Sequence, residues 1–256
     1  MLANNNEAII NKLAKNSVKT NKKQYAILFF TIILSAFMLF CVFTIGMTYL
    51  NSSRLQNTRL NGAEYDIVTM NGFTSEQLNT LQQNENIRSV GIESYAGFIQ
   101  STEYDKTVEI GLLWCDEVFW DNLMSPARTK LDGHYPQNKN ELMVTKDILK
   151  TCGNENLSVG DSLILTYENN TGVYTDEFVI SGIWDGYGDT SAGFVSKAFY
   201  DETGYDLKNN GILCIKLNCN YVFPTTIQSI EKSLDFSDRQ IFAPTGYIEN
   251  SFKLLL

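Results

Sequence analysis

The chain has 256 residues, of which 44% are hydrophobic and 19% charged, and its formal net charge is −9. This length is sufficient for one or two domains with a substantial core. The acidic balance argues against a nucleic-acid partner, and the presence of a single histidine, His134, excludes a metal site built from histidines.

The first 23 residues are basic, with one acidic residue, Glu7, against five lysines, for a net charge of +4. The lysines are Lys12, Lys15, Lys19, Lys22 and Lys23. Apolar residues between them recur at near-helical spacing, which predicts a basic amphipathic helix on the cytoplasmic membrane surface, with the lysines as membrane contacts. The alternative is a tail whose positive charge only sets the orientation of the chain.

No charged side chain occurs from Gln24 to Ser53, and Tyr25–Leu50 is apolar almost throughout. As a helix, Tyr25–Leu50 would be roughly 39 Å long, against about 30 Å for the hydrocarbon core of a bilayer. A core helix of a soluble protein is shorter and carries a polar stripe, and a signal peptide has only ~7–15 apolar residues before a small-residue cleavage site. The sequence therefore predicts a transmembrane helix over residues 24–50.

Charge on the two sides of this helix predicts its orientation. Beyond the span lie 15 of the 20 basic and 28 of the 29 acidic residues, a net charge of −13. Because positive charge beside a first span stays in the cytoplasm, we expect residues 1–23 inside the cell and the bulk of the chain outside the plasma membrane, after a single pass. Asn51–Asn61 is polar and lacks Pro and Gly, so the helix is expected to continue as a stalk over residues 51–62 until Gly62 ends it.

Two β-α-β units are predicted near the two ends of the extracytoplasmic domain, residues 63–256. The first has a strand, a helix and a strand over Tyr65–Met70, Thr74–Asn84 and Ile87–Gln100. The second has the same elements over Gly211–Leu217, Pro224–Leu234 and Arg239–Phe242. Thr74 and Gln77 have capping-box spacing, and Pro224 suits a first helical turn. Similar units on both sides of a middle piece predict an α+β subdomain with a second subdomain inserted into it.

The middle piece, about residues 105–205, is rich in strand signals separated by turn signals such as Asp132-Gly133. The expected strands are Val108–Trp114, Ser162–Tyr167, Glu177–Trp184 and Gly193–Val195. A short helix is expected over Asp147–Cys152, and His134 is expected to be an exposed residue of a turn over Leu131–Pro136.

An aromatic string follows the first of these strands. Trp114, Phe119 and Trp120 are a candidate exposed patch for a partner, and packing in the core is the alternative. Cys214 and Cys219 are close enough in sequence for a disulfide in an oxidising exterior, whereas core packing of Cys214 is the alternative if its segment is a strand.

Motifs that carry chemistry are missing from the sequence. It contains no G-x-S-x-G, H-E-x-x-H, C-x-x-C or Walker phosphate-binding motif, and no EF-hand loop. We therefore expect a protein that is not an enzyme, with no catalytic residue, no cofactor and no metal site. A membrane-anchored hydrolase would need His134 as its base.

Four stretches occur in a distinctive order. A basic lead-in, Leu13–Lys23, runs directly into Tyr25–Leu50. Farther on, Leu131–Leu142 is similar to L-x-G-R-x-P-x-x-x-x-E-(I/L), Leu157–Ser162 to a turn with (I/V)-G-D, and Phe178–Ile183 to F-x-(I/V)-x-G-(I/V). Together these stretches resemble the FtsX-like, or MacB-type, permease subunits of ABC transporters, although His134 replaces the arginine of the first motif.

This resemblance implies an extracytoplasmic core domain with a β-α-β porter-like subdomain (63–104 and 206–245) and a strand-rich insert (105–205). The motif glycines would be structural, and Glu141 would hold a loop. The resemblance also implies a partner ATPase that couples ATP hydrolysis to movement of the outer domain, in export, lipoprotein handling or antimicrobial-peptide response. Such permeases carry at least three further spans, so we expect a partial permease, or one that forms a dimer or binds a second permease half.

The partners implied are thus the lipid bilayer and an ABC ATPase on its cytoplasmic side. The alternative function is a single-pass, membrane-anchored extracytoplasmic sensor or binding module, which needs the same topology and no ATPase.

Overall fold

The computed structural model describes residues 6–100, 110–187, 192–218 and 224–245. Its contacts divide the chain into two compact units, Met1–Ser52 and Ser53–Leu256. The last turns of the predicted stalk therefore belong to the second unit, together with the domain predicted over residues 63–256.

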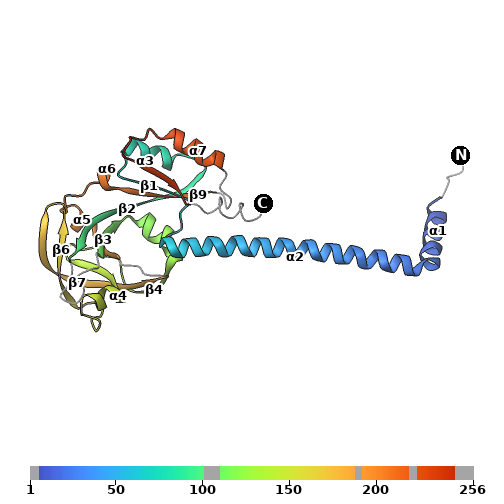
Figure 1. Ribbon diagram of the computed structural model, residues 1–256, viewed down its shortest axis with the longest axis horizontal. Helices are drawn as coiled ribbons and strands as arrows, with labels where there is room; N and C mark the ends of the chain where they lie inside the picture. Colours follow the sequence, from blue (N-terminus) through green and yellow to red (C-terminus); the bar gives the residue numbers. More distant parts are fainter. Residues whose placement is uncertain (1–5, 101–109, 188–191, 219–223, 246–256) are drawn as a thin grey trace. The chain divides into compact units, whose positions relative to one another are not determined.

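The first unit is helical. Helix α1 (Asn6–Thr20) is followed directly by α2 (Lys22–Asn61), and the chain bends between them at Asn21 (Figure 1). Within the described residues, α2 is the one helix long and apolar enough to cross a membrane. It continues through the predicted stalk and ends next to Gly62, whose φ of 72° is the left-handed conformation that commonly terminates a helix.

The second unit is a mixed α/β domain, as the sequence predicts. Its strands are β1 (Ile67–Met70), β2 (Ile87–Ile99), β3 (Ile110–Cys115), β4 (Arg128–Gly133), β5 (Glu141–Thr145), β6 (Ser162–Asn169), β7 (Gly172–Gly186), β8 (Ala192–Val195), β9 (Ile212–Leu217) and β10 (Ile241–Pro244). Its helices are α3 (Ser75–Gln82), the π-helix η1 (Val118–Leu123), the 3₁₀ turn η2 (Ser125–Ala127), α4 (Lys146–Thr151), α5 (Lys197–Tyr200), α6 (Leu207–Asn210) and α7 (Pro224–Ser233).

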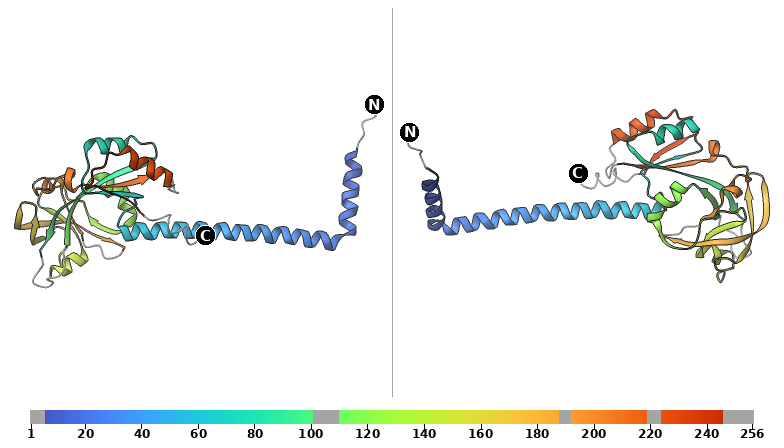
Figure 2. Two further views of the ribbon diagram at one scale, coloured as in Figure 1. Left: turned by 45° about the horizontal axis from the view of Figure 1, so that its top comes forward. Right: turned by 180° about the vertical axis from the view of Figure 1, so that it is seen from behind.

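The two predicted β-α-β units interlock. The strand order is β10-β1-β9-β2, with antiparallel neighbours throughout, so each unit has a strand of the other between its own two strands. This is the layout of a ferredoxin-like βαββαβ fold. Helices α3 and α7 lie side by side over this part of the sheet (Figures 1 and 2).

Local sequence signals explain where α3 begins and which side chains it and α7 bury. Thr74 and Gln77 make the predicted capping box, with Gln77 N donating to Thr74 Oγ1 (3.1 Å) and Thr74 N to Gln77 Oε1 (2.9 Å). The helices then bury Leu81 and Ile230 against Ile67 and Ile215 of the sheet. Removing these apolar side chains from water stabilises the helices on the sheet.

The inserted strands form a closed structure. Strand β2 pairs with β3, β3 with β8, β8 with β5, β5 with β7, β7 with β6, and β6 again with β2. This ring of pairings encloses a core that includes Leu112, Leu142, Leu165, Phe178 and Ile180. Strand β4 continues the sheet from β7.

Strand β2 belongs to both subdomains, and this refines the predicted division near residue 104. Its first half pairs with β9 over Ile87–Glu93, and its second half pairs with β3 over Glu93–Ile99. One continuous strand therefore runs from the porter-like part into the insert and is hydrogen-bonded in both.

Two strands of the insert were not predicted. Leu131–Pro136 was expected to be a turn, but β4 includes its first half, and β5 lies where no element was expected. His134 follows β4 and is exposed, as expected. Strand β4 escapes prediction because it is an exposed edge strand, rich in charged residues and lacking a regular apolar pattern.

The motif glycines and Glu141 have the structural roles that the resemblance implies. Gly133 has a φ of 89° and pairs with Gly182, and a Cβ on Gly133 would lie 2.2 Å from Ser181 O. The Glu141 carboxylate accepts hydrogen bonds from Gln137 N (2.7 Å) and Asn138 N (3.1 Å), which closes the loop before β5.

Candidate functional site

A cluster of paired, partly buried charges lies at the end of α2. Arg54, near the end of α2, forms an ion pair with Glu64, three residues before β1. Glu64 also pairs with Lys216 of β9, with Nζ and Oε1 3.4 Å apart. We call Arg54, Glu64, Asp66 and Lys216 the anchor cluster.

Asp66 completes this cluster. Its carboxylate lies 3.0 Å from Lys216 Nζ and accepts a hydrogen bond of 2.9 Å from the backbone N–H of Leu217. Its own backbone N–H donates to Ile215 O at 2.8 Å. Asp66 is thus held on β9 by side chain and backbone, and Lys216, only 5% exposed, bridges two carboxylates. Buried charges of this kind are stable only when paired.

The electrostatic balance favours the ionised form of Glu64. Burial by itself would raise the pKa of Glu64, but Lys216 and Arg54 more than offset this and hold its pKa below the ordinary value. Glu64 therefore stays negatively charged near neutral pH, and each cation has an anion to bind.

Packing reinforces the ion pairs. Thr58 and Ala63 are buried at the end of α2 and just beyond it. The Arg59 guanidinium lies over the ring of Tyr187, with its central carbon 4.0 Å from the ring centroid. The backbone N–H of Glu64 donates to Leu123 O at 2.7 Å. The helix end thus contacts the segment before β1 and the residue after β7, and it is linked to β9 and η1 through Glu64. A force on these turns would reach both subdomains.

The predicted lysines lie on helices and are exposed. Lys12, Lys15 and Lys19 are on α1, and Lys22 and Lys23 are in the first turn of α2. Their contact with a membrane surface stays a prediction.

The three aromatic residues of the predicted patch are buried. Trp114 stacks on Tyr200 with ring centroids 5.1 Å apart, and Trp120 packs against Phe194 at 5.5 Å. Phe119 lies in the same core as Trp120. The hypothesis of an exposed partner patch is therefore corrected: Phe119 and Trp120 fill the core between η1 and the sheet, and Trp114 lies in the core of the insert.

Cys214 is a buried free cysteine of β9, which is the core-packing alternative given above. Cys219, its candidate partner, lies outside the described residues. The short helix predicted near Asp147 is α4.

The anchor cluster itself was not predicted. Its signal is Lys216, the single charge in the otherwise apolar strand Ile212–Leu217. A buried lysine at such a position needs an acidic partner. The sequence does not indicate which carboxylates these are, because they lie about 150 residues away in the chain.

The chain is similar in structure to three solved domains. The periplasmic region of MacB from Actinobacillus actinomycetemcomitans has 13% identity and a TM-score of 0.49, covering 76% of this chain and 95% of that domain. The extracellular domain of the noncanonic ABC-type transporter YknZ from Gram-positive bacteria has 12% identity and a TM-score of 0.44, covering 70% and 98%. A domain of a protein from Porphyromonas gingivalis, described as a permease, has 11% identity and a TM-score of 0.41, covering 71% and 88%.

No protein-family model matches the chain, and no curated protein matches it in sequence. The likeness to the three solved domains concerns the fold. The first two are a periplasmic region and an extracellular domain of their own proteins, and the third is a domain of a permease protein.

Proposed function

We propose that this chain is a permease subunit of an ABC transporter, in which α2 couples events at the cytoplasmic face to the extracytoplasmic domain. One observation carries the proposal: a single helix, Lys22–Asn61, contains both the apolar segment and the turns that are fixed to the domain by the anchor cluster. A helix of this length extends about 60 Å, so it spans a bilayer and still reaches well beyond it.

In this proposal, Tyr25–Leu50 crosses the plasma membrane once. The lysines of α1 and of the first turn of α2 lie at the cytoplasmic surface, and the acidic domain lies outside. The support is the exposure of the large apolar side chains of this segment, which a bilayer would cover, and the reversal of charge across it.

The chain has a mechanical role in this mechanism and no chemistry of its own. A partner ATPase binds and hydrolyses ATP at the cytoplasmic face and displaces the start of α2. The helix then transmits the displacement to β1 and β9 through Arg54 and its partners in the anchor cluster. A single span cannot enclose a pathway, so the mechanism uses further spans, which come from the rest of a longer permease, from a second permease half or from a second copy.

The first experiment is purification of the tagged, full-length chain from membranes in mild detergent, followed by mass spectrometry. We expect an ATPase with a Walker motif to be enriched over an unrelated single-pass bait. Its reproducible absence would favour the alternative, a membrane-anchored sensor or binding module.

Coupling through α2 is tested with Gln56, an exposed residue of the stalk. Proline within a helix removes a hydrogen bond and destabilises it by about 3 kcal/mol, so Gln56→Pro interrupts α2 whereas Gln56→Ala preserves it. In the purified complex, ATP should change amide hydrogen exchange in β1 and β9 of the parent and of Gln56→Ala. A response that persists in Gln56→Pro would contradict coupling through the helix.

A further inference from the structure

The bend between α1 and α2 is held by specific hydrogen bonds. Asn21 N donates to Ser17 O at 3.0 Å, and Tyr25 N donates to Asn21 O at 3.1 Å. The hydroxyls of Ser17 and Tyr25, one on each helix, lie 3.1 Å apart and share a hydrogen bond. The bend thus has a defined geometry, which we call the elbow.

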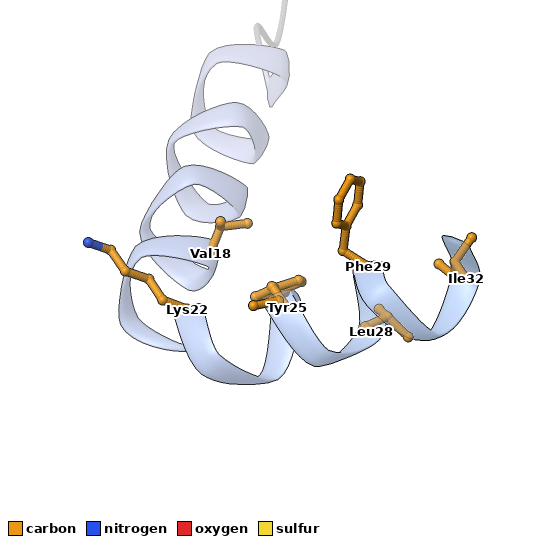
Figure 3. A pocket seen from close by; sticks show the side chains of 7 residues that line it. Val18, Lys22, Tyr25, Leu28, Phe29 and Ile32 are labelled. Carbon is orange, nitrogen blue, oxygen red and sulfur yellow. The ribbon is translucent and has the colours of Figure 1, made fainter. Parts of the chain in front are cut away.

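An apolar hollow lies in the inner angle of the elbow (Figure 3). Its volume is about 510 Å³, and it is lined by Val18, Lys22, Tyr25, Ala26, Leu28, Phe29 and Ile32. Lys22 is the only cation among these residues; its stem borders the hollow, and its ammonium points away from Phe29 and Ile32 (Figure 3).

The lining changes character along α2. Lys22 comes first, then Tyr25, and then the apolar Phe29 and Ile32, which are 61% and 59% exposed. Lys22 and Ile32 are separated by about 15 Å along the helix. A phospholipid has the same sequence of chemistry over a comparable length: an anionic phosphate, a polar interface where tyrosine is favoured, and an acyl chain.

We propose that the elbow binds one anionic phospholipid of the cytoplasmic leaflet. The phosphate lies at the rim beside Lys22, with Lys19 and Lys23 close by in sequence, and one acyl chain fills the hollow along Phe29 and Ile32. Charge complementarity identifies the occupant, because no acidic residue occurs between Glu7 and Glu64. The inference rests on the membrane topology of the proposed function.

The test places a tryptophan in the full-length chain, reconstituted into vesicles of identical lipid composition in which either phosphatidylglycerol or phosphatidylcholine has brominated acyl chains. Bromine quenches tryptophan on contact, and the native Trp114, Trp120 and Trp184 all lie in the domain. Phe29→Trp reports on the hollow. Phe30→Trp is the matched control, since Phe30 lies at the same depth and does not line the hollow.

Phe29→Trp should be quenched more strongly, per mole, by brominated phosphatidylglycerol than by brominated phosphatidylcholine. The expected preference is about fivefold, the effect of one lysine beside an anionic lipid. Phe30→Trp should show little preference between the two lipids. Adding Lys22→Gln to Phe29→Trp should remove the preference for brominated phosphatidylglycerol. Equal quenching of Phe29→Trp by both lipids, or the same preference at Phe30→Trp, would overturn the site.

Failure of the membrane topology gives a different result. Phe40→Trp lies in the middle of the apolar segment and should be quenched by both brominated lipids. If neither lipid quenches it, the span itself is wrong. If both quench it while Phe29→Trp shows no preference, the span stands and the lipid site fails.

Discussion

Lys216 carries the positive charge that two carboxylates of the anchor cluster share. We expect Lys216→Met to lower the free energy of unfolding by about 3–5 kcal/mol, because it leaves Asp66 and Glu64 without their buried cation. Chemical denaturation of the detergent-solubilised protein measures this change. Lys130→Met is the control, an exposed lysine that also lies on a strand. Equal losses in the two variants would show that pairing is not what holds Lys216.

Glu93 is a carboxyl group at the centre of β2, where the pairing passes from β9 to β3. It lies opposite Cys115 and Ile212 in the sheet, and burial raises its pKa to about 7. Among the described residues, no lysine or arginine forms an ion pair with it. The folded state therefore favours the protonated, neutral form of Glu93.

The raised pKa predicts a pH dependence of stability. The stabilising contribution of protonated Glu93 to folding is fully present below about pH 4.5, the ordinary pKa of a glutamate. It is lost as the pH rises through about 7. At pH 8 we expect the free energy of unfolding of Glu93→Gln to exceed that of the parent by about 1–3 kcal/mol. The two values should converge near about pH 4. Thermal unfolding across this pH range tests it, and a constant difference at every pH would contradict the assigned pKa.

Close packing of η1 on the sheet depends on Gly91 of β2. A Cβ at this position would lie 2.8 Å from Phe119 Cα and 2.7 Å from Leu123 Cδ1, and the first of these contacts is with backbone. The π-helix therefore approaches β2 more closely than any residue with a side chain allows.

Gly91→Ala should consequently destabilise the domain by about 1–3 kcal/mol, the usual consequence of overpacking. Gly111→Ala on β3 is the matched control, because its Cβ would make only an ordinary contact of 3.5 Å with Tyr95. Urea denaturation compares the two variants. Equal stability of both would mean that η1 shifts without penalty, and that Gly91 does not set its position.

Membrane topology is tested on intact cells with a thiol reagent that cannot cross the bilayer. Asn156 lies on the exposed surface of the insert, and Asn11 is exposed on α1. We expect Asn156→Cys to be labelled in intact cells, and Asn11→Cys only after permeabilisation, because the basic end stays in the cytoplasm. The parent chain gives the background of its native thiols. Labelling of Asn11→Cys in intact cells would reverse the orientation.

Much of the domain could be predicted from patterns among residues that are neighbours in the chain. The helix over Ser75–Gln82 was visible in its capping box, and strand β9 in its run of apolar residues. The termination of α2 at Gly62 follows from the backbone freedom of glycine. These features depend on residues within a few positions of one another, which is why sequence was enough.

Contacts between residues distant in the chain have no local signal in the sequence. The aromatic string from Trp114 to Trp120 gives no local indication of which face it covers, and the structure buries it. The ring of strands closes only because β6 reaches β2, about 70 residues earlier in the chain. The anchor cluster likewise depends on β1 and β9 lying side by side.

For this protein, then, sequence alone determined a long apolar helix with basic residues before it and an acidic α+β domain after it. The tertiary structure decided that the two β-α-β units interlock, that β2 is shared with a closed insert, and that the helix end is joined to the sheet through Arg54, Glu64 and Lys216. The physical reason is range: hydrophobic periodicity and capping act between neighbours in the chain, whereas strand pairing and buried ion pairs depend on which distant segments meet.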